Sequence, residues 1–194
     1  MTAPVITAPA PATVTAGTND LAAVPDFLAA LVVSDNCTVG ASITKTQSPA
    51  VGTLVPVGTT NVTIRATDTS GNEAQVVVSL TVLRANRAPV VYAGADQTIR
   101  LPSTATLSGT VTDDGLPTGA TVSLSWSKAS GPGSVTFGDG TAASTTATFS
   151  KSGTYTLRLT ASDTALTASD DVVVTVQAAS IPGSPSNVRV SSGL

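Results

Sequence analysis

The stretch that decides the fold is NVTIRATDTSGNEAQVVVSLTVL, residues 61–83. Apolar and polar residues alternate along its first half, which places Val62, Ile64 and Ala66 on one side of an extended chain. The turn residues DTSGN follow, and the β-branched run QVVVSLTVL (75–83) then forms the second arm. The stretch therefore predicts a β-hairpin that packs one face against a core.

The same pattern returns in the second half of the chain. Residues 155–177, YTLRLTASDTALTASDDVVVTVQ, again give an alternating strand, an Asp at its end, a short turn and a long last strand. Such a repeat indicates two modules of one kind. The segment RANRAPVV (84–91) lies between them and has the composition of a short linker, so we place the boundary near Asn86.

The composition supports an all-β class. Of the 194 residues, 41% are hydrophobic but only 3% aromatic and 11% charged, and small and β-branched residues make up the difference. Further strand signals separated by turns, such as TVSLSWSK (121–128), favour sandwiches. Only residues 21–33 have a helix-like composition, and because Pro25 interrupts them we expect irregular chain leading into a strand.

We therefore predict two tandem immunoglobulin-like β-sandwich domains, residues 1–85 and 86–178. Residues 179–194 are expected to be a linker or the first strand of a further module, because PSNVRVSS (185–192) is similar to the start of a fibronectin type III module.

The charge pattern argues against several partners. The net charge is −3 and the basic residues are scattered, whereas nucleic-acid binding needs a concentrated basic face. No apolar run is long enough for a transmembrane helix, so we expect neither nucleic-acid binding nor membrane insertion. The start MTAPVITAPA is not a signal peptide, which leaves a removed leader or another route, such as virion assembly, open.

Catalysis is not expected. The chain has no histidine, and its single cysteine, Cys37, therefore has no imidazole partner within the chain. Carboxylates are paired at Asp113–Asp114 and Asp170–Asp171, but neighbouring residues of a strand point to opposite faces. Neither pair then converges on one substrate.

Calcium is the one cofactor that the sequence suggests. This ion takes oxygen ligands from carboxylates and loop carbonyls, and the predicted module ends supply such residues. The candidates are Asp68, Asn72 and Asp35 in the first module, and Asp96, Asp113, Asp114 and Asp163 in the second. The alternative is that these side chains only form turns by capping backbone amides.

The first module resembles the hyalin repeat (HYR), an immunoglobulin-like extracellular module. The matching pieces are PVITAPAPATVTA near the start, SDNC (34–37), TQSPAVGTLVPVGTTNVTIRATDTSGN (46–72) and the terminal VVVSLTVL. In such modules the cysteine after DN pairs with an earlier one. Here the corresponding early positions hold Ala8 and Asp20, so we expect Cys37 to be the remaining half of a lost disulfide, packed as a small hydrophobe, or bridged to another copy.

The second module resembles the polycystic-kidney-disease (PKD) type module of large surface proteins. The matching pieces are residues 88–117, residues 124–163 and DDVVVTVQ. On this resemblance Trp126 fills the sandwich centre and Tyr155 forms a tyrosine corner. The connections then turn at glycines, namely Gly131, Gly133 and Gly153.

The expected function is structural. The resemblances imply a spacer or adhesive segment of an extracellular or cell-surface protein, with other modules, neighbouring copies, surface proteins or polysaccharides as partners. Two alternatives stay open: a bacteriophage virion decoration or tail protein, and an accessory module of a secreted polysaccharide- or protein-degrading enzyme.

Overall fold

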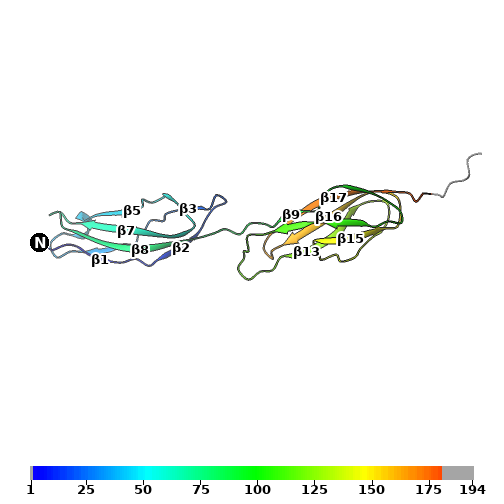
Figure 1. The fold of residues 1–194 in the computed structure, drawn as a ribbon. Helices are drawn as coiled ribbons and strands as arrows, with labels where there is room; N and C mark the ends of the chain where they lie inside the picture. The colour runs from blue at the N-terminus through cyan, green and yellow to red at the C-terminus, as the bar shows by residue number, and fades with distance from the viewer. Residues whose placement is uncertain (1, 181–194) are drawn as a thin grey trace, which may run out of the picture. The chain divides into compact units, whose positions relative to one another are not determined.

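The computed structural model describes residues 2–180, and it divides into two compact units, residues 1–85 and residues 86 onward. Both units are built from β-strands, and the one helical element in the described chain is a 3₁₀ turn at Gly40–Ser42. No helix in this part is long and apolar enough to cross a membrane. The all-β prediction is confirmed (Figure 1).

The first unit is a sandwich of one four-stranded sheet and two strand pairs. The sheet has the order β2-β8-β7-β5, and the pairs are β1-β4 and β3-β6. The strands are β1 Val5–Thr7, β2 Ala12–Thr15, β3 Leu21–Ala23, β4 Val32–Ser34, β5 Thr44–Ser48, β6 Leu54–Pro56, β7 Gly58–Thr67 and β8 Glu73–Leu83. The hairpin predicted from the opening stretch is β7–β8, with Ile64 opposite Val76.

The core of the first unit confirms the predicted alternation of apolar and polar residues in β7. Val62, Ile64 and Ala66 of β7 are all fully buried. Val62 and Ile64 belong to one core cluster with Phe27 and Leu31 of the irregular chain between β3 and β4. Residues 21–33 do lead into a strand as predicted, although their first three residues form the short strand β3, which the composition did not indicate.

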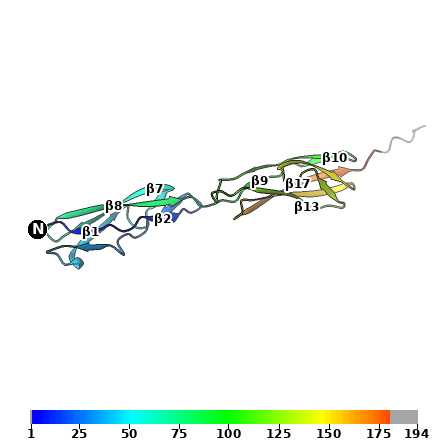
Figure 2. The same ribbon diagram turned by 90° about the horizontal axis from the view of Figure 1, so that it is seen from below.

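The second unit has a four-stranded sheet of order β10-β17-β16-β13, opposite a three-stranded sheet β11-β15-β14 and the pair β12-β9 (Figure 2). Its strands are β9 Val90–Tyr92, β10 Gln97–Arg100, β11 Ala105–Ser108, β12 Thr110–Thr112, β13 Ser123–Ser130, β14 Val135–Phe137, β15 Ser144–Phe149, β16 Gly153–Ser162 and β17 Thr167–Gln177. The hairpin β16–β17 corresponds to β7–β8, which is the internal repeat seen in the sequence.

Trp126 and Tyr155 anchor the core of the second unit, as the resemblance implied. Trp126 of β13 is 6% exposed, stacks on Phe137 at 6.1 Å and donates its Nε1–H to the carbonyl of Ala142 at 3.1 Å. Tyr155 is fully buried, and its hydroxyl donates to the carbonyl of Lys151 at 2.8 Å. Both aromatic side chains thus bury their apolar bodies while satisfying their polar atoms.

Candidate functional site

The first strand of the first unit switches partners half-way. Its earlier part, β1, pairs antiparallel with β4, and its later part, β2, pairs parallel with the last strand, β8. The register sets Ala12 opposite Leu80 and Thr15 opposite Leu83. One further bond extends the parallel ladder, because the amide of Ala16 donates to the carbonyl of Leu83 at 2.8 Å. The N-terminal and C-terminal strands of this unit are therefore hydrogen-bonded to each other side by side.

The second unit repeats this arrangement. Strand β9 pairs antiparallel with β12, and β10 pairs parallel with the last strand, β17. The amide of Leu101 donates to the carbonyl of Gln177 at 3.0 Å, in the position that Ala16 and Leu83 occupy in the first unit. Arg100 adds a side-chain bond to Gln177 Oε1 at 2.7 Å. The parallel terminal strands are thus a shared feature of both units.

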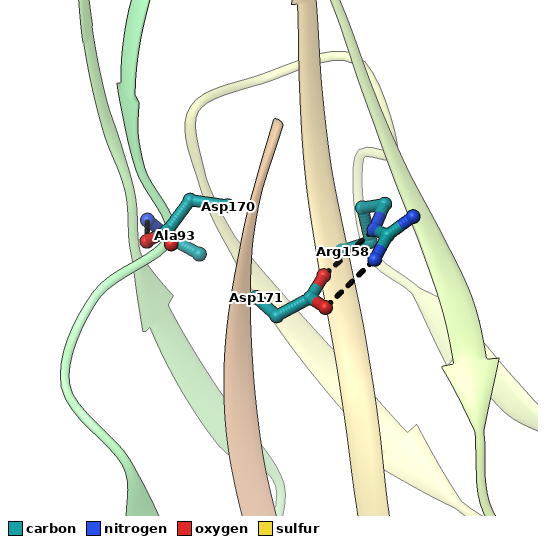
Figure 3. Close-up of polar contacts among 4 residues, drawn as sticks. All are labelled: Ala93, Arg158, Asp170 and Asp171. Atoms are coloured by element: carbon teal, nitrogen blue, oxygen red, sulfur yellow. Dashed lines mark hydrogen bonds and ion pairs between the residues drawn. The ribbon is translucent and has the colours of Figure 1, made fainter. Parts of the chain in front are cut away.

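Two aspartates stabilise the chain between β9 and β10, where the first strand changes its pairing partner. Asp170 Oδ2 of β17 accepts the amide of Ala93 at 2.9 Å (Figure 3), and Asp96 Oδ1 accepts the amide of Val173 at 2.8 Å. Both bonds join the first strand of the unit to its last strand across 77 residues of sequence. Amides that lose their ladder partners at the switch are therefore satisfied by side chains.

Asp171 points away from Asp170 and binds Arg158 of β16 (Figure 3). Arg158 Nε and Nη2 donate to the two carboxylate oxygens of Asp171 at 2.8 Å each. The hydrogen bond from this guanidinium lowers the pKa of Asp171. The prediction that neighbouring strand carboxylates do not converge holds for this pair. Asp113 and Asp114 instead lie in the loop after β12.

The hairpin aspartates of the two units are used in the same way. Asp68 Oδ1 accepts the amides of Ser70 and Asn72 at 2.8 Å each, and its Oδ2 accepts Asn72 Nδ2 at 2.7 Å. The side-chain bond from Asn72 is the main reason why the pKa of Asp68 is lowered. Burial opposes this shift by favouring the neutral form, but the donors outweigh it.

Asp163 is the counterpart of Asp68 and is 1% exposed. Its Oδ1 accepts the amides of Ala165 and Leu166 at 2.8 and 2.6 Å, and its Oδ2 accepts Asn86 Nδ2 at 3.0 Å. The amide of Leu166 contributes most to lowering the pKa of Asp163. Both aspartates therefore stay ionised and hold the turns of their hairpins.

Unsatisfied oxygens gather at the end of the second unit where the linker enters. Asn86 Oδ1, Asp113 Oδ1 and Asp114 Oδ2 are buried and accept no hydrogen bond. Thr112 at the end of β12 pairs with Val90 at the start of β9, so the loop after β12 and the linker before β9 share one end of this unit. Uncompensated buried oxygens are costly, and strain, an ordered water or a bound ion can each account for such atoms.

The structure separates the six predicted calcium ligands. Asp68 and Asn72 lie in the first unit, whereas the others lie in the second, where Asp96 and Asp163 already accept backbone amides. Within residues 2–180, no three acidic, histidine or cysteine side chains form a group suited to a metal. Asn86 was not among the predicted ligands, and it lies two residues before Ala88-Pro89 at the module boundary.

The prediction that Cys37 is packed as a small hydrophobe is wrong, because its side chain is exposed. Asp35 explains the difference, since its Oδ2 accepts the amides of Cys37 and Thr38 at 2.9 and 2.7 Å and closes a tight turn. Tyr92 lies in β9 and is 51% exposed. The described residues hold no pocket.

Two family matches account for most of the chain. Residues 1–82 match the HYR domain, and residues 93–176 match the PKD domain of the K319L-like type. The chain is a HYR domain followed by a PKD-like domain. Both are non-catalytic modules, and both are typical of extracellular and surface proteins.

Solved structures agree with this fold. Mouse cadherin-23 EC22-24 is 18% identical, with 91% of this chain and 67% of that chain covered at a TM-score of 0.58. Human protocadherin-24 EC1-2 is 17% identical, with coverage of 92% and 100% and a TM-score of 0.55. The PKD domain of the KIAA 1837 protein is 30% identical, with 52% of this chain and 98% of that domain covered at a TM-score of 0.41. The HYR and PKD-like domains therefore share the fold of tandem cadherin repeats.

Proposed function

We propose that this chain is a non-enzymatic, load-bearing spacer within a modular extracellular or cell-surface adhesive protein. The observation that carries the proposal is the parallel pairing of the first and last strands in both domains, β2 with β8 and β10 with β17. A chain whose terminal strands run parallel enters each domain at one end and leaves it at the other. Each domain then adds its full length to the spacer.

The same pairing determines how a domain responds to tension. Force between the two ends of a domain pulls the first strand and the last strand in opposite directions along their common axis. The ladder bonds between them, including Ala16 to Leu83 and Leu101 to Gln177, are then loaded together in shear. Bonds that share a load resist it better than bonds that open one after another, so this geometry suits a segment under tension.

A matched pair of proline variants tests the load-bearing role. Because the amide of Ala16 points to β8, the period of two places the amide of Ala12 on the same side and that of Thr13 on the open edge. Ala12→Pro should therefore lower the unfolding force of the HYR domain in end-to-end single-molecule pulling, and Thr13→Pro should lower it less. The PKD-like domain serves as the internal reference. Equal forces for both variants and the parent would refute the role of the parallel pair.

The partners follow from the open surfaces. Both four-stranded sheets end in edge strands, at β5 in the HYR domain and at β13 in the PKD-like domain, where the amide of Trp126 already donates to the carbonyl of Gly140 at 2.7 Å. Free strand edges pair readily with a further strand. We propose neighbouring copies and modules as the first class of partner, with surface proteins or polysaccharides as the second, and we propose no contact with nucleic acid or with the membrane interior.

We also propose calcium as a ligand of the PKD-like domain. The residues that would hold it are Asn86, Asp113 and Asp114, whose buried oxygens accept no hydrogen bond in the protein. Two carboxylates and an amide oxygen are ligands that calcium accepts. The ion would neutralise the two adjacent carboxylates and compensate the buried oxygens. The amides of Gly115 and Leu116 donate to one oxygen each of Asp113 and Asp114, and the other oxygen of each carboxylate is buried without a donor. Asp68, Asn72, Asp96 and Asp163 fit less well, because they have no such buried oxygen among the described residues.

Thermal unfolding tests this proposal. Trp126 is the only tryptophan and lies in the PKD-like domain, so its fluorescence follows that domain alone. Added calcium should raise the melting temperature above the value in chelator, and Asp113→Asn should remove the difference. Identical melting temperatures in calcium and chelator would exclude the ion.

A further inference from the structure

The direction of the backbone hydrogen bonds in β5 follows from the hairpin beside it. The amide of Asp68, just after β7, donates to the carbonyl of Asn72 at 3.1 Å, so the backbone groups of Asp68 point toward β8. Backbone groups alternate between the two sides of an antiparallel strand, and those of Arg65 therefore point toward β5. Thr46 lies opposite Arg65 and returns these bonds. Every second residue of β5 thus bonds to β7, and the residues between them face the open edge.

Lys45 and Gln47 are the two residues of β5 whose backbone groups face the open edge. Among the described residues, no hydrogen bond reaches the amide or the carbonyl of either one. Their side chains are half-buried, whereas the exposed positions of β5 are Thr44, Thr46 and Ser48. The edge therefore offers unpaired backbone donors and acceptors beside an uncharged row of hydroxyl side chains.

The corresponding edge of the PKD-like domain, at β13, is already occupied. The amide of Trp126 donates to the carbonyl of Gly140 at 2.7 Å, and the Trp126 side chain donates to the carbonyl of Ala142 in the same loop. Lys128 Nζ in addition donates to the carbonyl of Gly133 at 2.8 Å. A further strand would have to displace these contacts, so β5 is the edge that accepts a partner strand more readily.

A second copy of the same strand fits the open edge of β5. When two copies run antiparallel with their Thr46 residues opposite each other, each Lys45 lies opposite a Gln47, and each such pair exchanges two backbone hydrogen bonds. A shift by two residues in one direction sets the two Lys45 side chains directly opposite each other, where like charges are destabilising. A shift in the other direction sets Lys45 opposite Pro49, which has no amide to donate. The charge and the proline therefore select one register, as an inward charge on an edge strand limits its pairings.

We propose that β5 is a docking edge at which two copies of this chain join antiparallel through Lys45 and Gln47 into one continuous sheet. The proposal rests on the spacer function and commits its first class of partner to a second copy at a stated strand. One strand pair makes a small interface, and small interfaces are typical of weak, transient contacts. Such contacts become effective on a surface that carries many copies, because linked sites bind with avidity.

Sedimentation velocity of the full chain measures this association, with Cys37→Ser in every sample to prevent disulfide dimers. The sedimentation coefficient of the parent should rise with protein concentration up to about 1 mM, the range in which weak contacts form. Lys45→Pro removes an open-edge amide without removing a ladder bond to β7, a change that edge strands tolerate. It should weaken the dimer by roughly tenfold or more, because each copy loses one donor of the new ladder. Circular dichroism confirms that the variant keeps its strands.

Two matched controls separate the open-edge amide from other effects. Lys45→Thr removes the charge and keeps the amide, and it should still form the dimer. Thr13→Pro removes an open-edge amide of β2, at the other edge of the same sheet, and should leave the dimer unchanged.

A cross-linking experiment tests the register without proline. Thr46→Cys, again with Cys37→Ser, places one thiol of each copy directly opposite the other, so oxidation should give a disulfide dimer. Val77→Cys is the control, because Val77 is 56% exposed on β8, two strands away from the edge, and it should give little dimer.

A parent chain that sediments as a monomer at every concentration would overturn the proposal, and so would a folded Lys45→Pro chain that dimerises like the parent. Loss of the dimer in Thr13→Pro but not in Lys45→Pro would overturn it by moving the contact to β2. Neither result alters the load-bearing role of the terminal strands, which is measured as the unfolding force of single molecules. Conversely, a failed force experiment would leave the sedimentation result unchanged, so the two proposals fail by different measurements.

Discussion

The hydroxyl of Tyr155 donates a hydrogen bond of 2.8 Å to the backbone carbonyl of Lys151, four residues earlier. The bond closes the loop between β15 and β16, and the ring packs at 4.7 Å from Phe149. Tyr155 lies near the start of β16, the strand between β17 and β13 in its sheet. One side chain thus ties this loop to the four-stranded sheet.

Tyr155→Phe removes this bond and keeps the ring. The carbonyl of Lys151 loses its donor in a part-buried setting, so we expect the PKD-like domain to lose about 1 kcal/mol of unfolding free energy. Denaturant titration followed by Trp126 fluorescence measures the change. Tyr92→Phe is the matched control, because Tyr92 is 51% exposed, and it should stay within about 0.5 kcal/mol of the parent. Equal effects of both substitutions would rule out a role for the hydroxyl bond.

Gly109 connects β11 to β12, and its environment excludes any side chain. A Cβ at this position would lie 2.6 Å from the carbonyl oxygen of Ala143 and 2.7 Å from Leu159 Cδ2. Because the backbone oxygen cannot move cheaply, Gly109→Ala should destabilise the domain by roughly 1–3 kcal/mol. Gly140→Ala has no atom within 4 Å of the added methyl and should be near neutral. If Gly109→Ala unfolds at the denaturant concentration of the parent, the packing described for this corner is wrong.

Acid should destabilise both domains through their hairpin aspartates. Hydrogen bonds hold the pKa of Asp163 and that of Asp68 below the ordinary value of 3.8. A lowered pKa in the folded state adds stability that is fully present above the unfolded pKa and is lost as the pH falls toward the folded pKa. The denaturation midpoint should therefore drop between about pH 5 and about pH 2. Asp163→Asn should flatten this dependence for the PKD-like domain, and an unchanged slope would contradict the assignment.

Cys37 should react in the native protein. Its side chain is exposed on the turn that Asp35 closes, so a maleimide reagent should modify it completely without denaturant. Mass spectrometry of the native and the unfolded chain gives the comparison. Protection of the native thiol would contradict its exposure. A dimer on a non-reducing gel, absent in Cys37→Ser, would in addition establish a bridge between copies, which the sequence left open.

The alternation of apolar and polar residues was enough to predict much of the fold. The buried positions of β7, the long hairpins and the two-fold repeat are local patterns of one or two strands, and such patterns survive folding unchanged. The roles of Trp126 and Tyr155 came from the resemblance to the PKD-type module, and the structure confirms both.

The polar contacts were harder to predict because they join distant parts of the chain. Asn86 and Asp163, Ala93 and Asp170, and Asp96 and Val173 are each 77 residues apart. No spacing rule connects them, since they meet only when the first strand docks beside the last. The exposure of Cys37 was missed because the resemblance to the hyalin repeat suggested the packed half of a lost disulfide, whereas Cys37 lies exposed in a turn that Asp35 closes.

The direction of loading tests the central claim most directly. In the PKD-like domain, pulling end to end shears β10 against β17. The comparison pulls between cysteines introduced at Ser152 and Ala178, with Cys37 replaced by serine. This second direction opens β16 from β17 one residue pair at a time, beginning at Gly153 and Val176. If the parallel terminal strands bear the load, the end-to-end unfolding force should exceed the force between residues 152 and 178. An end-to-end force equal to or below the force between those two residues would contradict the account.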